Sequence, residues 1–266
     1  MVNKKKIIFG IIIGVALAIL YVPILTIIIF SFHEGTVISF QSFQFGFQLF
    51  RNLFSDDRIL TAIRNSLIIA TSAALIATII GTLASFAMLR MGKRAKGAMM
   101  GLNLTPMVNA TIVTGVALMI MFGVLGMQTW GWTRLILAHT LVALPIVMII
   151  ILPRFKGMDS PQYDAAQDLG ANQIQAFIKV IFPQILPAMI GAFLVGFTLS
   201  VDEFIITNYN RAGIITIPSL VYMSSFAPTP AEFRALSAIV FFVVLAALFI
   251  VNWRLSKRKK KLMKNK

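Results

Sequence analysis

The chain has 266 residues, of which 58% are hydrophobic and only 12% are charged. A soluble domain carries about 25% charged residues, so the composition excludes an ordinary soluble protein. The charges are also segregated, which leaves apolar runs long enough to cross a bilayer, and we expect an all-α integral membrane protein. Because cysteine is absent, a disulfide framework, a thiolate metal site and a cysteine nucleophile are excluded.

Six apolar runs are predicted to span the membrane, over about residues 7–32, 66–89, 101–125, 135–152, 185–207 and 235–253. The first follows the basic residues Lys4 to Lys6; it is too long for a signal peptide and no small-residue cleavage site follows it. Segment 33–63 alternates aromatic and polar residues, and either lies along the outer membrane surface or forms a solvated loop. His139, inside the fourth run, is more consistent with a hydrogen bond to a neighbouring helix than with a proton relay.

The distribution of basic residues predicts the orientation of this single transmembrane domain over 1–266. With the N-terminus inside, the inner segments are the start, loop 90–97, loop 153–183 and the basic tail 254–266; they hold 18 of the 24 Lys and Arg residues. The positive-inside rule therefore predicts that both termini are cytoplasmic. The tail can lie on anionic lipid headgroups, so the net charge of +15 needs no nucleic-acid partner.

The inner loop 153–183 carries the densest helix signals. Two pairs have the spacing of a capping box: Asp159 with Gln162, and Asn172 with Gln175. Gly170, between them, is typical of a helix C-terminal cap. Pro183 and Pro187 are expected to end the second helix. The sequence thus predicts a short helix, a glycine corner and a short amphipathic helix, a shape that suits docking into a groove of another protein.

Two carboxylates, Asp202 and Glu203, lie inside the fifth predicted span, where charge is costly and usually functional. On a continuous helix, Glu203 shares a small, polar stripe with Ser200 and Thr207, whereas Asp202 lies on another face. We expect Glu203 to face a polar path and Asp202 to face a neighbouring helix. The alternative is that both carboxylates are structural, paired to Arg or backbone donors of other helices.

Enzyme chemistry is disfavoured. The sequence has no phosphate-binding P-loop, no HExxH zinc motif and no spacing that suggests a Ser/His/Asp triad, so we expect no catalytic residue, no metal site and no cofactor in this chain. Energy for transport would then come from another subunit or from an ion gradient. A self-contained ion-coupled secondary transporter or channel would use Asp202, Glu203 and His139 as a relay, but no clear internal repeat supports it.

Several stretches resemble permease subunits of binding-protein-dependent ABC importers of type I. The EAA loop of that family is matched by Asp164 (usually Glu in the family), Ala165, Ala166, Gly170, Phe177, Val180 and Pro183. The Asn65-Ser66-Leu67 stretch resembles the start of the conserved core of these permeases. FTLSVDEFIIT and IPSLVYMSSFAPTPAEFRALSAI are similar to the spermidine/putrescine branch, and the chain length is most like its second permease subunit.

The resemblance implies a permease in the plasma membrane of a bacterium, with a cytoplasmic coupling-helix loop between spans four and five. Its implied partners are a homologous second permease, an extracytoplasmic binding protein and two ATPase subunits that carry ATP and Mg. Closure of the ATPases would push the coupling loop and switch the path between the permeases. The implied substrate is a polyamine, or another small solute of the same importer class, with Glu203, Asp202, Ser200 and Thr207 as candidate path residues.

Overall fold

The computed structural model describes residues 4–35, 41, 43–157, 160–224, 231–243, 245, 246 and 249. The chain divides into two compact units: unit 1 is Met1–Leu60 with Met223–Lys266, and unit 2 is Thr61–Tyr222. Within the described ranges the regular structure is helical, and the isolated bridge between His33 and Phe45 is the one extended pairing. The predicted all-α class is therefore confirmed for the part of the chain that is described.

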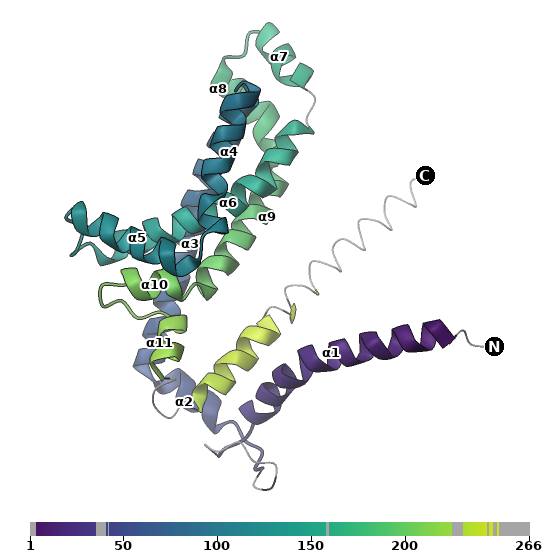
Figure 1. Cartoon of the computed structure of the whole chain (residues 1–266), viewed down its shortest axis with the longest axis vertical. Coiled ribbons are helices and arrows are strands. Elements are labelled where there is room, and N and C mark those ends of the chain that lie inside the picture. The colour runs from purple at the N-terminus through teal and green to yellow at the C-terminus, as the bar shows by residue number, and fades with distance from the viewer. Residues whose placement is uncertain are drawn as a thin grey trace. The chain divides into compact units, whose positions relative to one another are not determined.

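The helices are, in chain order, α1 (Lys4–Ser31), α2 (Gln48–Ser55), α3 (Asp57–Leu89), α4 (Lys93–Val108), α5 (Thr111–Val124), α6 (Gly131–Lys156), α7 (Ser160–Asp168), α8 (Gln173–Ala176), the π-helix η1 (Phe177–Ile181), α9 (Phe182–Asp202), α10 (Ile205–Asn210) and α11 (Ile217–Ser224) (Figure 1). Within the part of the chain that the structure describes, four helical stretches are long and apolar enough to cross a membrane, and the bent pair α4–α5 would make five. Residues 232–243 are helical and include the first part of the sixth predicted run, 235–253, the rest of which falls mostly outside the described residues. Six spans and cytoplasmic termini stay predictions.

Unit 1 begins with α1, whose apolar side chains are largely exposed. After α1 the chain forms an isolated antiparallel bridge, in which Glu34 N donates to Gln44 O (3.1 Å) and Gly46 N donates to Phe32 O (2.8 Å). Rings then gather beside α2: the Phe32 and Phe50 centroids are 5.2 Å apart. Aromatic residues are typical of membrane interfaces, so the expectation that this segment lies along the outer membrane surface stays open.

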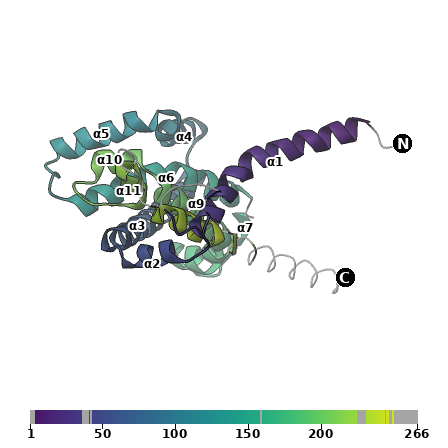
Figure 2. The same ribbon diagram turned by 90° about the horizontal axis from the view of Figure 1, so that it is seen from below.

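In unit 2, α6 and α9 pack along each other and lie side by side in both views (Figures 1 and 2), and α3 contacts α6 at Gly81 and α9 at Ala74. Small residues make this possible. A methyl group added at Gly81 would lie 2.7 Å from a methyl carbon of Val147, and one at Gly196 would meet Val147 at 3.5 Å and Ala143 at 3.7 Å. In lipid, where helix association depends on packing, such small residues let backbones approach closely.

The predicted third span, 101–125, is not one straight helix. It comprises the end of α4 and all of α5, which meet at an angle of 105° (Figure 1). Asn109 and Ala110 at the break have extended ψ angles of 147° and 132°. Asn is a poor helix former because its side chain competes for backbone hydrogen bonds, and Pro106 removes a donor one turn earlier.

The expectation that Pro183 and Pro187 end the second loop helix is wrong. Helical structure runs without a break over Gln173–Asp202, through α8, η1 and α9. Phe182 N donates to Phe177 O, a π-type bond that spans five residues. A π turn changes the register ahead of Pro183, which has no N–H to donate, and so lets the helix continue past it.

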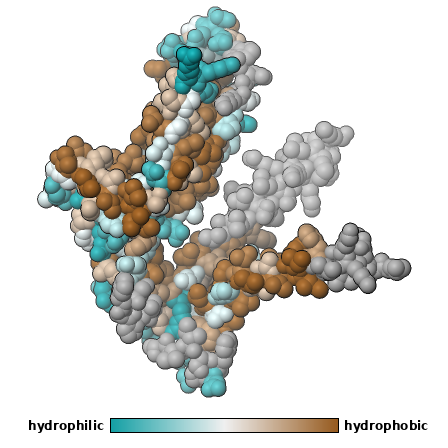
Figure 3. Space-filling view, in the orientation of Figure 1, coloured by the Kyte–Doolittle hydropathy of each residue, from teal (hydrophilic) through white to brown (hydrophobic). Residues whose placement is uncertain are grey.

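The hydropathy of the surface of unit 2 changes from one end to the other. The end that carries α7 is mostly hydrophilic, whereas the flanks formed by α5, α6 and α9 are mostly hydrophobic (Figure 3). Exposed Leu194, Ile190 and Leu186 contribute to the apolar flank of α9. This division is the one expected of a membrane-spanning bundle that carries a polar loop at one end.

Candidate coupling loop and substrate-path residues

Gly170 forms the corner that the sequence predicts. Its φ is +90°, a region that favours glycine. Gly170 N donates to Gln167 O (2.8 Å) and Ala171 N donates to Ala166 O (3.0 Å), the pair of bonds of a Schellman cap. The corner therefore ends α7 and satisfies two carbonyl groups that the helix would otherwise leave unpaired.

The second half of the loop begins with the predicted capping box. Asn172 Oδ1 accepts from Gln175 N (2.8 Å), and Gln175 Oε1 accepts from Asn172 N (3.1 Å). This prediction is confirmed. The other predicted box depends on Asp159, which lies outside the described residues.

The loop residues expected to couple to an ATPase divide into two groups. Asp164, Ala165, Gly170 and Pro183 are exposed, whereas Ala166 and Phe177 are partly buried against the core of unit 2. Three large apolar side chains project from the same loop: Leu169, Ile174 and Ile178 are 90%, 70% and 56% exposed. Helical spacing in the sequence predicts that Ile174 and Ile178 lie on the apolar face of the second loop helix. Sequence reasoning did not single out Leu169, for which the available signal was its apolar character in a hydrophilic segment.

An aromatic cluster, which we define as Phe86, Phe155, Tyr163 and Phe177, joins this loop to two long helices. The Phe86 ring of α3 lies 4.9 Å from Phe177 in η1, 5.8 Å from Phe155 in α6 and 6.0 Å from Tyr163 in α7. Rings at such distances and tilts stabilise one another through edge-to-face contact. The cluster therefore links the loop directly to α3 and α6.

Arg90, which directly follows α3, packs against this aromatic cluster. Its guanidinium carbon lies 5.9 Å from the Phe86 ring and 5.6 Å from the Tyr163 ring, and its Nη2 donates to Tyr163 Oη over 3.3 Å. The sequence placed Arg90 only among the basic loop residues. The Arg90 side chain also holds α7 to α3, because its planar guanidinium stacks on the aromatic faces of Phe86 and Tyr163 better than an ammonium group would.

The two candidate carboxylates do not lie within one continuous helix. The helix α9 ends at Asp202, Glu203 has an extended ψ of 103°, and α10 begins at Ile205. Glu203 Oε1 accepts from Ile206 N (3.0 Å), a backbone donor in the first turn of α10. The predicted span over 185–207 is therefore interrupted, because this side chain offers the backbone a partner that competes with the helix.

His139 of α6 bridges the break. Its Nδ1 lies 2.7 Å from Ser200 Oγ in α9 and its Nε2 lies 2.9 Å from Thr207 Oγ1 in α10. All three side chains are buried, with Thr207 fully inaccessible. The expectation that His139 bonds to a neighbouring helix is confirmed, and Ser200 and Thr207 are its partners.

The candidate path residues are thus brought together, apart from Asp202. Glu203 is half-buried and joins His139 and Ser200 around a hollow of about 10 Å³, roughly the room that one water needs. Asp202 is exposed on the chain surface rather than packed against a helix of unit 2. Glu203 has a backbone donor, as the structural alternative requires, and its role in transport stays a prediction.

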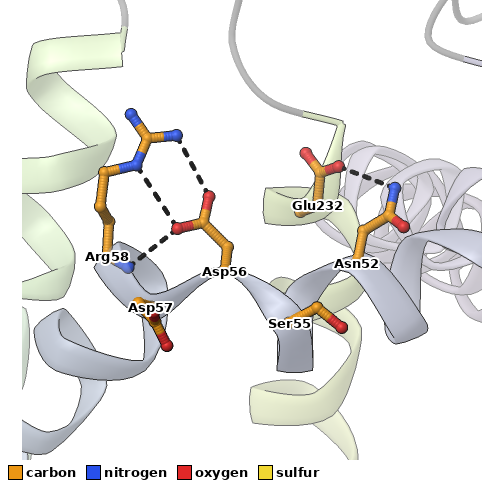
Figure 4. Close-up of a pocket in the computed structure, with 6 residues that line it drawn as sticks. All are labelled: Asn52, Ser55, Asp56, Asp57, Arg58 and Glu232. Atoms are coloured by element: carbon orange, nitrogen blue, oxygen red, sulfur yellow. Dashed lines mark hydrogen bonds and ion pairs between the residues drawn. The ribbon is translucent and has the colours of Figure 1, made fainter.

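A second hollow lies in unit 1 and is lined by Asn52, Ser55, Asp56, Asp57, Arg58 and Glu232 (Figure 4). Arg58 bends over Asp56, with its Nη2 3.2 Å from Oδ2, and its backbone N donates to Oδ1 over 2.8 Å. The hydrogen bonds from the Arg58 side chain lower the pKa of the Asp56 carboxyl. Asn52 Nδ2 donates to Glu232 Oε1 over 3.2 Å, so most of these groups satisfy one another.

Residues 77–260 match the family described as binding-protein-dependent transport system inner membrane component. The chain belongs to this family, whose members are membrane permease subunits of ABC importers and not enzymes. The resemblance inferred from the EAA loop is therefore confirmed, and the chain is a multi-pass membrane protein of the bacterial type.

Characterised relatives cover nearly the whole chain. The spermidine/putrescine transport system permease protein PotC of Haemophilus influenzae is 32% identical over 247 residues, which cover 92% of this chain and 94% of that protein. PotC of Escherichia coli K12 is 31% identical over 91% of each chain. The putrescine transport system permease protein PotI of E. coli K12 is 30% identical, over 91% of this chain and 88% of that one.

Solved structures share the fold at lower identity. A bacterial ABC transporter involved in the import of the acidic polysaccharide alginate has a TM-score of 0.67 and 16% identity, covering 96% of both chains. A bacterial alginate ABC transporter in complex with an alginate pentasaccharide-bound periplasmic protein also has a TM-score of 0.67, with 15% identity over 91% of this chain and 92% of that one. At these identities the likeness concerns the fold alone.

Proposed function

We propose that this chain is the membrane subunit of an ATP-driven importer of polyamines such as spermidine and putrescine. The observation that carries the proposal is the break at Glu203. A half-buried carboxylate stands there at the C-terminal end of α9, with exposed Asp202 beside it, in a chain similar to polyamine permeases. The negative end of a helix dipole and two carboxylates favour a cation.

The charge of the substrate distinguishes this proposal from others within the same fold. A fold neighbour belongs to a transporter that imports an acidic polysaccharide, so the architecture by itself leaves the substrate open. Glu203 Oε1 is occupied by Ile206 N–H, and within the described ranges no group donates to its Oε2. That oxygen is the one we assign to an ammonium group of the substrate, since paired charges interact strongly where water is scarce.

Coupling would use the loop between α6 and α9. The exposed side chains Leu169, Ile174 and Ile178, together with Asp164 and Ala165, would dock into a groove of an ATPase subunit. The aromatic cluster and Arg90 would carry the displacement to α3 and α6. In this proposal ATP and Mg bind the two ATPase subunits, this chain holds no cofactor, and alternating access arises between two homologous permeases.

The test is reconstitution of the complete importer in liposomes: this chain, a homologous permease, two ATPase subunits and the extracytoplasmic binding protein. Uptake of labelled spermidine or putrescine that requires ATP and the binding protein is expected. Polyamine uptake by this chain alone, without ATP, would instead support an ion-coupled secondary transporter. ATP-driven uptake of another solute, with none of polyamine, would keep the importer class and reject the substrate.

A further inference from the structure

The break between α9 and α10 interrupts the helical hydrogen bonds at the residue we assign to the substrate. Something other than the backbone ladder must therefore fix the angle at which Glu203 leaves α9. Two hydrogen bonds from side chains of α10 help to fix its position. Thr207 Oγ1 donates to Glu203 O (2.7 Å), and Asn210 Nδ2 donates to Gly115 O of α5 (3.2 Å). His139 of α6 is hydrogen-bonded to both sides of the break.

The protons of this network can be assigned from its partners. The single hydroxyl proton of Thr207 is used toward Glu203 O, so Thr207 Oγ1 must accept from His139 Nε2–H. Nδ1 of a neutral imidazole is then an acceptor, and Ser200 Oγ–H, 2.7 Å away, is its donor. The chain of hydrogen bonds runs from Ser200 through His139 and Thr207 to the carbonyl of Glu203.

We propose that His139, as the neutral Nε2–H tautomer, is the positioning residue that fixes the α9–α10 break and thereby the direction of Glu203. The inference rests on the proposed function for the role of Glu203 in transport. It assigns His139 no contact with the substrate and no proton transfer. The essential bond is the one from Nε2–H to Thr207, because among the hydrogen bonds of the described residues it is the one that joins α6 to α10, beside an apolar contact between Ala138 and Ile206.

Two near-isosteric variants separate the two bonds of the imidazole. The amide of His139→Gln reaches the position of Nε2 and can donate to Thr207, whereas that of His139→Asn reaches only the position of Nδ1 and Ser200. In the complete importer, His139→Ala and His139→Asn should raise the KM for spermidine about tenfold, the loss of roughly one buried hydrogen bond. His139→Gln should stay within about threefold of the parent.

Measuring KM together with the maximal rate distinguishes a positioning role of His139 from a general role in folding. A variant that merely reduced the amount of assembled transporter would lower the maximal rate and leave KM unchanged, and that result would overturn the inference. Thr140→Val is the matched control. Thr140 is buried on the same helix and its hydroxyl bonds only to Ile136 O of its own turn, so its KM should equal the parental value.

A distance measurement tests the break without relying on uptake. The chain has no cysteine, so paired spin labels at Leu194→Cys and Asn208→Cys, both exposed, report across the break when the other subunits are made cysteine-free. His139→Ala should broaden the distance distribution, and His139→Gln should restore it. Parental distances in His139→Ala would overturn the inference. Parental uptake by Glu203→Gln would instead overturn the proposed function, and the distance test would still decide the role of His139.

Discussion

The ring of Phe86 lies 4.9 Å from that of Phe177, edge to face, and this contact joins α3 to the π turn of the loop between α6 and α9. Phe177 belongs to the loop motif shared with importer permeases, whereas Phe86 lies on a long helix of the bundle. The pair is therefore the shortest described aromatic connection between the loop and the bundle.

Phe86→Ala should uncouple the loop from the bundle. Removing the ring takes away the central member of the aromatic cluster, at a cost of about 3 kcal/mol or more in packing. We expect ATP hydrolysis by the assembled complex to continue while uptake per ATP falls at least severalfold. The two rates are measured on the same proteoliposomes. Phe86→Leu, which retains bulk, should lose less, and full uptake by Phe86→Ala would show that the loop transmits its motion elsewhere.

Gly170→Val should misplace the coupling corner. At a φ of +90° a β-branched residue is strained, at a cost of about 1 kcal/mol or more. Membrane insertion should survive, because Gly170 lies outside the apolar helices, while binding of the ATPase or uptake fails. A pull-down of the ATPase beside an uptake assay measures both. Gly170→Asn is the control, since Asn tolerates this region; normal uptake by inserted Gly170→Val would contradict the role of the corner.

Gly81→Ala should destabilise the contact between α3 and α6. The added methyl group would lie 2.7 Å from Val147 Cγ1, and a β-branched side chain has little freedom to move away. Overpacking of this kind costs about 1–3 kcal/mol, so the melting temperature in detergent should fall by several degrees. Gly101→Ala, where nothing lies within 4 Å, is the matched control and should not lower it. Equal melting temperatures for the two variants would contradict the tight packing.

The sequence predicts the local elements of the loop well because their signals are local. The φ of Gly170 and the paired bonds of Asn172 and Gln175 depend on residues within one turn, and both are as expected. The continuation of the helix through Pro183 was not predictable in the same way. A proline normally ends a helix, and only the π turn before it changes that outcome.

The carboxylate site was predicted in composition but not in geometry. Ser200, Glu203 and Thr207 do gather, but around a break and not along one stripe, because α9 ends at Asp202 and the Glu203 side chain accepts from Ile206 N of α10. The link through His139 joins positions 61 and 68 residues apart, which no short-range pattern can specify. The bend of 105° between α4 and α5 was likewise not predicted, because Pro106 and Asn109 favour a break but do not specify the angle at which the two helices meet.

The most direct test of the central claim is uptake of labelled spermidine and putrescine by the complete importer carrying Glu203→Gln. This change keeps the shape of the side chain and an oxygen for Ile206 N–H, and it removes the charge. The account predicts a severe loss of uptake with ATPase binding intact, and a smaller loss for Asp202→Asn. Uptake of Glu203→Gln at the parental rate, in a complex assembled to the parental level, would contradict it.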